Sequence, residues 1–198
     1  MTEPSLQRRY VYHQLIHRWG KADDIVGFDP ALASRPSPFS SLDIAIWRAE
    51  DETDVTVFNT LGMSELRMQG AEHLVELNLG IRGRLDAATE RPLSAFLADI
   101  TAYPFAAGVK IDWWERLTNL PEIPGYPGCQ QVLFAPSFAE DEFSWLQMPE
   151  EPVKLLYVIP ITSRENHILA AHGQEAFESY LDEEEIDLFT PRSDAPRG

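Results

Sequence analysis

The stretch that decides the fold is DVTVFNTLGMSELRM, residues 54–68. Its first half is rich in β-branched and aromatic residues, which suit a pleated and largely buried strand. Gly62 follows directly, and a glycine at the point where a strand pattern breaks usually marks a positive φ or a close approach of the backbone. The sequence therefore predicts a central strand that ends in a turn at Gly62, Met63 and Ser64.

Further elements follow from the hydrophobic periodicity on either side of this stretch. Strands are expected at 42–48, 73–79, 129–134, 142–148 and 153–161, and helices at 5–20, 92–103, 163–173 and 174–184. No helix-length segment separates the first three strands, so they should form an antiparallel meander. Pro92 is placed at the first position of its helix, and Pro104 is expected to stop it. The predicted fold is α+β, a mixed and largely antiparallel sheet with helices packed on its faces.

With 198 residues, the chain is long enough for one large domain with a substantial core. We expect an N-terminal helix and a Pro/Ser-rich connection over residues 1–41, the main domain over 42–188, and a disordered tail over 189–198. The segment PEIPGYPG, residues 121–128, cannot sustain regular structure and is predicted to be a surface loop.

The charge of the chain is strongly negative, since 16 basic residues stand against 32 acidic ones and give −16 at pH 7. This charge repels phosphate backbones and anionic lipids, so we expect neither nucleic acid nor membrane as a partner. A basic protein is the natural complement, although acidity that only keeps the protein soluble is an equally simple interpretation. Cys129 is the only cysteine, and no stretch approaches the ~20 apolar residues of a membrane span. We therefore expect a cytoplasmic protein.

Four segments carry a resemblance to a known family. The turn Thr60-Leu-Gly-Met-Ser64 resembles the threonine-x-glycine-methionine-serine signature of the suppressor of fused domain family. Three later segments are similar to parts of that family in the same order, namely RPLSAFL at 91–97, VLFAP at 132–136 and VKLLYVIPITSRE at 153–165. The resemblance implies the same α+β class of fold.

The resemblance also implies a function. In animals the family binds and restrains zinc-finger transcription factors, while many bacterial members look like immunity proteins that neutralise a cognate toxin in polymorphic toxin systems. This chain is similar to the bacterial single-domain type. We therefore expect a protein without enzymatic activity or cofactor, most simply an immunity protein that sequesters a toxin, with regulatory binding of a transcription factor as a further alternative.

An enzyme is the alternative from a different class, a hydrolase or metal-dependent enzyme that uses His13, His17 and nearby acids. The segment His13-Gln-Leu-Ile-His17 differs in one residue from the H-E-x-x-H zinc motif, but Gln14 cannot act as the general base. An exposed polar helix face is the simpler interpretation, so no metal is predicted there. Ser64 lacks the second glycine of a nucleophile elbow, and Cys129 is more simply a small core residue.

The predicted partner-binding surface combines acids with aromatic side chains, because rim charges speed association while buried aromatic anchors hold a complex together. Trp113 and Trp114 are adjacent, so they cannot face the same way in regular structure. The candidate residues are Glu140, Asp141, Glu142, Phe143, Trp145, Glu150, Glu151, Trp113 and Trp114, with Phe138 as a further anchor. A second acidic cluster, without any lysine or arginine, spans residues 175–187.

Overall fold

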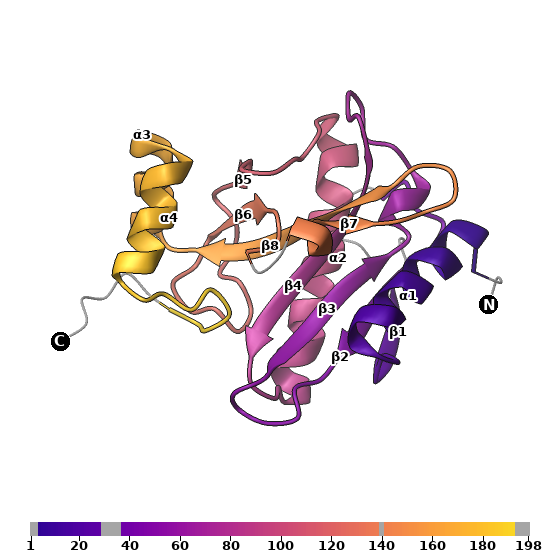
Figure 1. Ribbon diagram of the computed structural model, residues 1–198, viewed down its shortest axis with the longest axis horizontal. Coiled ribbons are helices and arrows are strands. Elements are labelled where there is room, and N and C mark those ends of the chain that lie inside the picture. Colours follow the sequence, from indigo (N-terminus) through magenta and orange to yellow (C-terminus); the bar gives the residue numbers. More distant parts are fainter. Residues whose placement is uncertain (1–3, 29–36, 139–140, 193–198) are drawn as a thin grey trace.

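A computed structural model describes residues 4–28, 37–138 and 141–192, and the side chains of Asp141 and Glu142 are not among the parts described. Most of the predicted Pro/Ser-rich connection and the end of the predicted tail lie outside these residues, as does Glu140. Within them, the protein is built on one mixed sheet with helices on both faces (Figure 1).

The sheet has eight strands in the described part of the chain. They are β1 (Asp24–Phe28), β2 (Leu42–Trp47), β3 (Val55–Leu61), β4 (Leu74–Arg82), β5 (Arg116–Leu117), β6 (Gln131–Ala135), β7 (Trp145–Leu146) and β8 (Val153–Ile161). Their order is β1-β2-β3-β4-β8-β6-β5, with β7 paired to β8. Strands β4 and β8 run parallel, and the other pairs are antiparallel. The predicted meander, the central strand and the largely antiparallel sheet are confirmed.

The helices divide between the two faces of the sheet. They are α1 (Leu6–Trp19), α2 (Ala87–Ala107), α3 (Ser163–His172) and α4 (Gln174–Glu183), with short 3-10 turns η2 (Met63–Glu65) and η3 (Asp141–Ser144). Helix α2 packs against one face and forms the main core with β2, β3, β4, β6 and β8. On the other face, α1 packs at one end and α3 with α4 at the other, each over its own apolar cluster. Figure 1 shows the strands that lie between these two coverings.

Strand alternation explains this division. In β8, Leu156 and Val158 point into the core under α2, whereas Ile159 and Ile161 point to α3 and α4. Val153 points in the same direction as Ile159 but meets the α1 cluster, because it lies at the other end of the strand. The long apolar segment predicted as an interior strand is therefore buried on both faces.

The predictions for the two prolines of α2 are wrong. The helix begins after Asp86, whose side chain accepts a hydrogen bond from the Thr89 amide, and it ends at Gly108 in the left-handed conformation. Pro92 and Pro104 both lie inside it. A proline inside a helix costs ~3 kcal/mol, and the burial of one whole helix face under the sheet outweighs that local cost.

Three other features differ from the sequence prediction. Strand β1 was not predicted, and it takes up the start of the expected Pro/Ser-rich connection. Thr162, not Ser163, caps α3, because the Thr162 and Glu165 side chains form a reciprocal capping box. Of the strand expected at 142–148, only β7 is a strand.

The segment 121–128 is irregular, as predicted, but it is not a surface loop. Ile123 and Tyr126 are buried in the main core. The Tyr126 hydroxyl donates a hydrogen bond to the Gly80 carbonyl at 2.6 Å. Its prolines and glycines turn the backbone while its two large side chains fill the core, and composition alone does not reveal the second role.

Candidate functional site

The predicted turn after the central strand closes around a buried carboxylate. Glu76, on the neighbouring strand β4, is fully buried. Its Oε1 accepts hydrogen bonds from the Gly62 amide at 3.0 Å, the Ser64 amide at 3.1 Å and the Ser64 hydroxyl at 2.7 Å. The Thr60 hydroxyl is in hydrogen-bond contact with Oε2. Burial raises the pKa of Glu76 above its ordinary value, and these hydrogen bonds oppose the rise.

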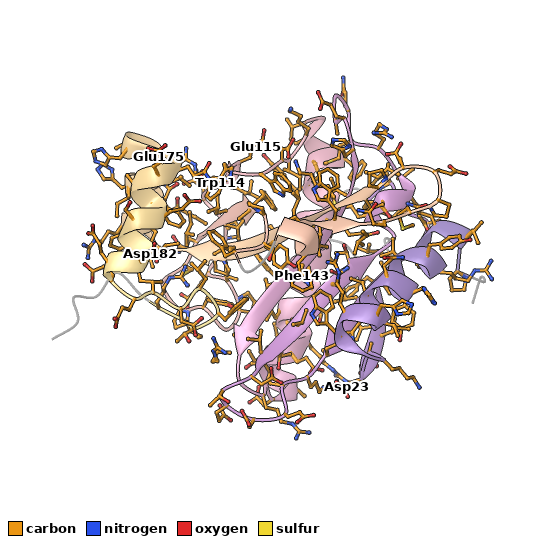
Figure 2. The ribbon with its side chains drawn as sticks, viewed as in Figure 1. Asp23, Trp114, Glu115, Phe143, Glu175 and Asp182 are labelled. Carbon is orange, nitrogen blue, oxygen red and sulfur yellow. The ribbon has the colours of Figure 1, made fainter. Side chains whose placement is uncertain are left out.

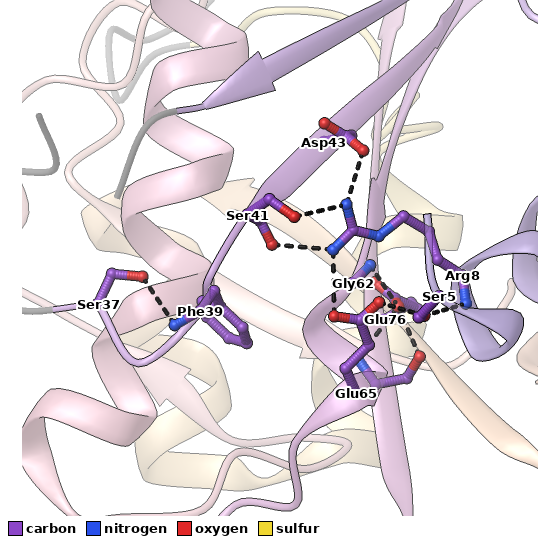
Figure 3. A network of polar contacts seen from close by, with 10 residues as sticks. Ser5, Arg8, Ser37, Phe39, Ser41, Asp43, Gly62, Glu65 and Glu76 are labelled. Atoms are coloured by element: carbon purple, nitrogen blue, oxygen red, sulfur yellow. Dashed lines mark hydrogen bonds and ion pairs between the residues drawn. The ribbon is translucent and has the colours of Figure 1, made fainter. Parts of the chain in front are cut away.

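Gly62 has a φ of 122°, so the predicted turn is confirmed, with η2 directly after it. A Cβ at this position would lie 2.6 Å from Nη2 of Arg8. The buried Arg8 guanidinium contacts Asp43 at 2.8 Å and Glu65 at 3.1 Å, and it also binds Ser41 (Figure 3). Two constraints therefore favour glycine at position 62. One is the positive φ, and the other is the Arg8 side chain of α1, which leaves no room for a Cβ.

We refer to Thr60, Gly62, Met63, Ser64 and Glu76 as the signature turn. Met63 is 1% exposed and belongs to the main core. The Ser64 hydroxyl donates to Glu76, which fits the prediction of a turn hydroxyl. Each polar group named in this turn has a partner inside the protein, so the signature turn stabilises the fold and offers no free chemistry at the surface.

The histidines of α1 are exposed, as predicted, and their rings contact each other with centroids 4.5 Å apart. Among the described residues, no group of three or more His, Cys, Asp or Glu side chains is arranged to hold a metal ion. Cys129 is fully buried in the main core, which confirms its interpretation as a core residue.

The open face of the sheet carries a groove of about 770 Å³, between α1 at one end and the segment after α4 at the other. Its floor includes Val55 and Val57 of β3 and Gly80 of β4. Six of the described residues that line it are aromatic, namely Trp19, Trp47, Phe138, Phe143, Tyr157 and Phe189. We call this feature the aromatic groove. Figure 2 shows Phe143 above the middle of the sheet, at a distance from Glu175 and Asp182 on α4.

Hydrogen bonds hold the wall nearest α1 in place. Trp47 donates from its indole nitrogen to the Gly20 carbonyl at 2.9 Å, and its ring contacts Trp19 edge to face. Arg18 donates to the Phe143 carbonyl at 2.9 Å and lies 5.2 Å from the centre of that ring. The Tyr157 hydroxyl also donates to the Phe143 carbonyl. The aromatic wall is therefore ordered before any ligand arrives, which lowers the entropy cost of binding.

The segment after α4 closes the other end of the groove. Arg82 donates its amide proton to the Phe189 carbonyl at 2.8 Å, and its guanidinium pairs with Asp187 at 2.9 Å. A Cβ at position 80 would lie 2.8 Å from Cδ1 of Phe189, so the glycine leaves the space that this ring occupies.

Of the predicted anchors, Phe143 and Phe138 line the aromatic groove. Trp113 and Trp145 instead contact each other away from it, with the Lys154 ammonium 3.7 Å from the centre of the Trp113 ring. Asp112 pairs with Lys154, so this cation is balanced inside the protein.

Trp114 packs in the cluster of α3 and α4, so the two adjacent tryptophans join different clusters, as expected. Glu150 is exposed, and Glu151 pairs with Arg67 at 2.6 Å. The sequence reasoning missed the contribution of Trp19, Trp47 and Tyr157 to the groove. No local pattern identifies them, because they come from three separate elements.

In residues 4–28, 37–138 and 141–192, no helix combines the length and the apolar character that crossing a membrane requires.

Comparison with known proteins identifies the relatives of this chain. The model of the suppressor of fused protein (SUFU) family matches residues 39–192. A protein named as a SUFU homolog from Neisseria gonorrhoeae FA 1090 is 18% identical, with a TM-score of 0.66 over 97% of this chain and 98% of that one.

Two further structures share the fold. Sufu in the Sufu–Fu complex is 11% identical, with a TM-score of 0.67 over 94% of this chain and 86% of that one. Drosophila Suppressor of Fused is 12% identical, with a TM-score of 0.66 over 93% of this chain and 48% of that one. A search of the curated proteins gave no match. The family match extends over most of the sequence, and the chain belongs to the suppressor of fused family.

Proposed function

We propose that this protein is a non-enzymatic binding protein and that the aromatic groove is where it holds a protein partner. The observation that carries the proposal is the aromatic wall of the groove, which stays partly open although hydrogen bonds already fix it. Tyrosine and tryptophan are enriched where partner proteins bind, because they offer a large contact area at a low entropy cost.

Membership of the family supports binding as the general activity. One structure of similar fold is that of Sufu in a complex with Fu. The finer proposal is that the partner is a basic toxin domain and that this protein acts in the cytoplasm as its immunity protein. The formal charge of −16 supports a basic partner, because opposite charges raise the rate of association.

Two alternatives carry less support. Regulation of a transcription factor would use the same kind of binding, and the identity of the partner separates it from immunity. For a hydrolase or metal-dependent enzyme, His13 and His17 are the candidate groups, and in the described residues they contact each other without a third ligand. No observation on these histidines favours catalysis.

Affinity capture from the native cytosol tests the proposal, with the wild-type protein and two variants as bait. Phe138→Ala removes a wall of the groove, and Leu66→Ala is the matched control, since their exposed fractions are 45% and 38%. We expect the control to retain the partner and Phe138→Ala to lose most of it. Retention by both variants would contradict binding at the groove.

A growth-rescue test addresses the finer proposal. The captured partner is expressed alone and together with the wild-type protein or either variant. We expect the partner to arrest growth, and the wild type and Leu66→Ala to restore it. A partner that binds at the groove but is harmless when expressed would contradict immunity and leave the binding function intact.

A further inference from the structure

An acidic turn borders the aromatic groove. It joins β2 to β3, and Glu50, Asp51, Glu52 and Asp54 are all exposed within it. Glu50 and Asp54 line the groove, together with Asp23, the residue before β1. We refer to Glu50, Asp51, Glu52 and Asp54 as the acidic turn. In the sequence, Asp51 and Glu52 of this run indicate only the turn into the central strand.

The acidic turn holds its shape through backbone contacts. Asp54 accepts hydrogen bonds from the Glu50 amide at 3.2 Å and the Val55 amide at 2.8 Å. Asp51 accepts from the hydroxyl and the amide of Thr53, and these hydrogen bonds lower the pKa of Asp51. The Asp51 carboxylate is therefore charged at neutral pH. The Arg82 guanidinium also donates a hydrogen bond to the Thr53 carbonyl of this turn at 2.6 Å.

Within the described residues, the carboxylates of the acidic turn lack a basic partner side chain. Across the described residues, none of the four carboxylates of the acidic turn forms an ion pair with lysine or arginine. Two arginines lie close by, but Arg48 pairs with Glu90 and Asp24, and Arg82 pairs with Asp187. Among the described residues, Lys21 is the other cation that lines the groove besides Arg48.

We propose that the aromatic groove receives a segment of the partner in which a large apolar side chain is flanked by lysine or arginine, with the apolar side chain on the groove floor and the basic side chains at the acidic turn. This inference rests on the proposed function and specifies the chemistry of the partner. Charge complementarity selects this occupant, since an acidic segment would meet unpaired carboxylates at the rim and be repelled.

The protein already shows this combination of groups where Phe189 lines the groove. The Phe189 ring occupies the space over Gly80, and the Arg82 guanidinium lies 5.7 Å from the centre of that ring. An aromatic ring at one end of the groove is therefore accommodated together with a cation beside it. In the proposed complex, the apolar side chain and the basic side chain of the partner form a similar pair near Phe138, which is 45% exposed.

The two parts of the site have different physical roles. Exposed carboxylates act over about a Debye length, ~8 Å at physiological salt, and mainly raise the association rate. The aromatic wall excludes water from the apolar side chain and mainly slows dissociation. Charge reversal at the acidic turn and truncation of Phe138 should consequently change different rate constants.

The test uses short random peptides displayed on phage and selected against the intact protein at low salt. Synthetic copies of the enriched peptides are then measured against three variants. Glu50→Lys with Glu52→Lys reverses two side chains that form no ion pair with the described residues. Glu175→Lys with Glu183→Lys makes the same change of charge on α4, as the matched control, and Phe138→Ala tests the groove itself.

We expect enriched peptides to carry an aromatic or large aliphatic residue next to lysine or arginine. Reversal at the acidic turn should weaken their binding by roughly tenfold at low salt, with a much smaller effect of the α4 control. A different result would overturn this inference and leave the groove as the binding site: neutral or acidic peptides whose binding is lost in Phe138→Ala but unchanged by charge reversal at the acidic turn. Peptides indifferent to Phe138→Ala, or no enrichment at all, would count against both proposals.

Discussion

The signature turn and the aromatic groove differ in how far their side chains are satisfied inside the protein. In the signature turn, a fully buried Glu76 accepts hydrogen bonds from Gly62, Ser64 and Thr60. In the groove, aromatic side chains are held in place, and Phe138 and Phe189 remain exposed to solvent. The first region stabilises the fold, and the second leaves surface for a partner. The motif that identifies the family in the sequence therefore lies apart from the candidate binding site.

This difference has a physical origin. A buried carboxylate needs several donors in fixed positions, so it dictates a short run of residues with a glycine and a hydroxyl, and such a run is visible in a sequence. A groove wall needs only large side chains that converge in space, and these come from α1, β2, β8 and the segment after α4. A sequence motif therefore identifies the buried carboxylate turn far better than it identifies the groove wall.

The largest effect is expected in the signature turn. Glu76→Ala leaves the Gly62 and Ser64 amides and two hydroxyls without their acceptor, so we expect the free energy of unfolding to fall by about 4 kcal/mol. Glu76→Gln keeps an acceptor at the Oε1 position and should lose much less. Chemical denaturation of both variants provides the measurement. An alanine variant as stable as the parent would show that the turn does not depend on this side chain.

Gly62→Val tests the same region through the backbone. Strain at the positive φ and the clash with the Arg8 guanidinium should together cost about 3 kcal/mol. Ser64→Ala removes one of several hydrogen bonds to Glu76 and should cost about 1 kcal/mol. Thermal melts compare the two variants. Equal melting temperatures for Gly62→Val and the parent would remove the evidence for strain at this turn.

The pH dependence of stability offers an independent probe of Glu76. Burial raises its pKa in the folded state, so the folded protein retains a proton that the unfolded chain releases at an ordinary value of ~4.3. The contribution of Glu76 to the free energy of unfolding therefore declines as the pH rises from that value through the folded-state pKa. Subtracting the profile of Glu76→Gln should reveal this decline, and coincident profiles would argue against it.

The smallest effect is expected on the exposed face of α1. Replacing both His13 and His17 by alanine removes a contact between two exposed rings, so stability should change by less than about 0.5 kcal/mol. Partner binding should also be unaffected. Loss of partner binding in a folded double variant would indicate that the binding site lies on this helix and not in the groove.

Local patterns predicted the elements that local chemistry determines. The strand before Gly62, the turn itself and the buried strand β8 were all predicted from a few consecutive residues. Pro92 and Pro104 misled the helix prediction, because packing against the sheet overrides a local helix breaker. From the sequence, the acidic turn was recognised only as the turn into the central strand. Its position beside the groove depends on the pairing of β2 with β3 and on the packing of α1.

The most direct test of the account is surface plasmon resonance with the captured partner, comparing Phe138→Ala in the groove with Ser64→Ala in the signature turn. Both variants are first shown to be folded at the temperature of the measurement. We predict that Phe138→Ala weakens binding by roughly tenfold or more, chiefly through faster dissociation, whereas Ser64→Ala binds like the wild type. Wild-type binding by Phe138→Ala, together with weakened binding by Ser64→Ala, would contradict the assignment of stability to the turn and of binding to the groove.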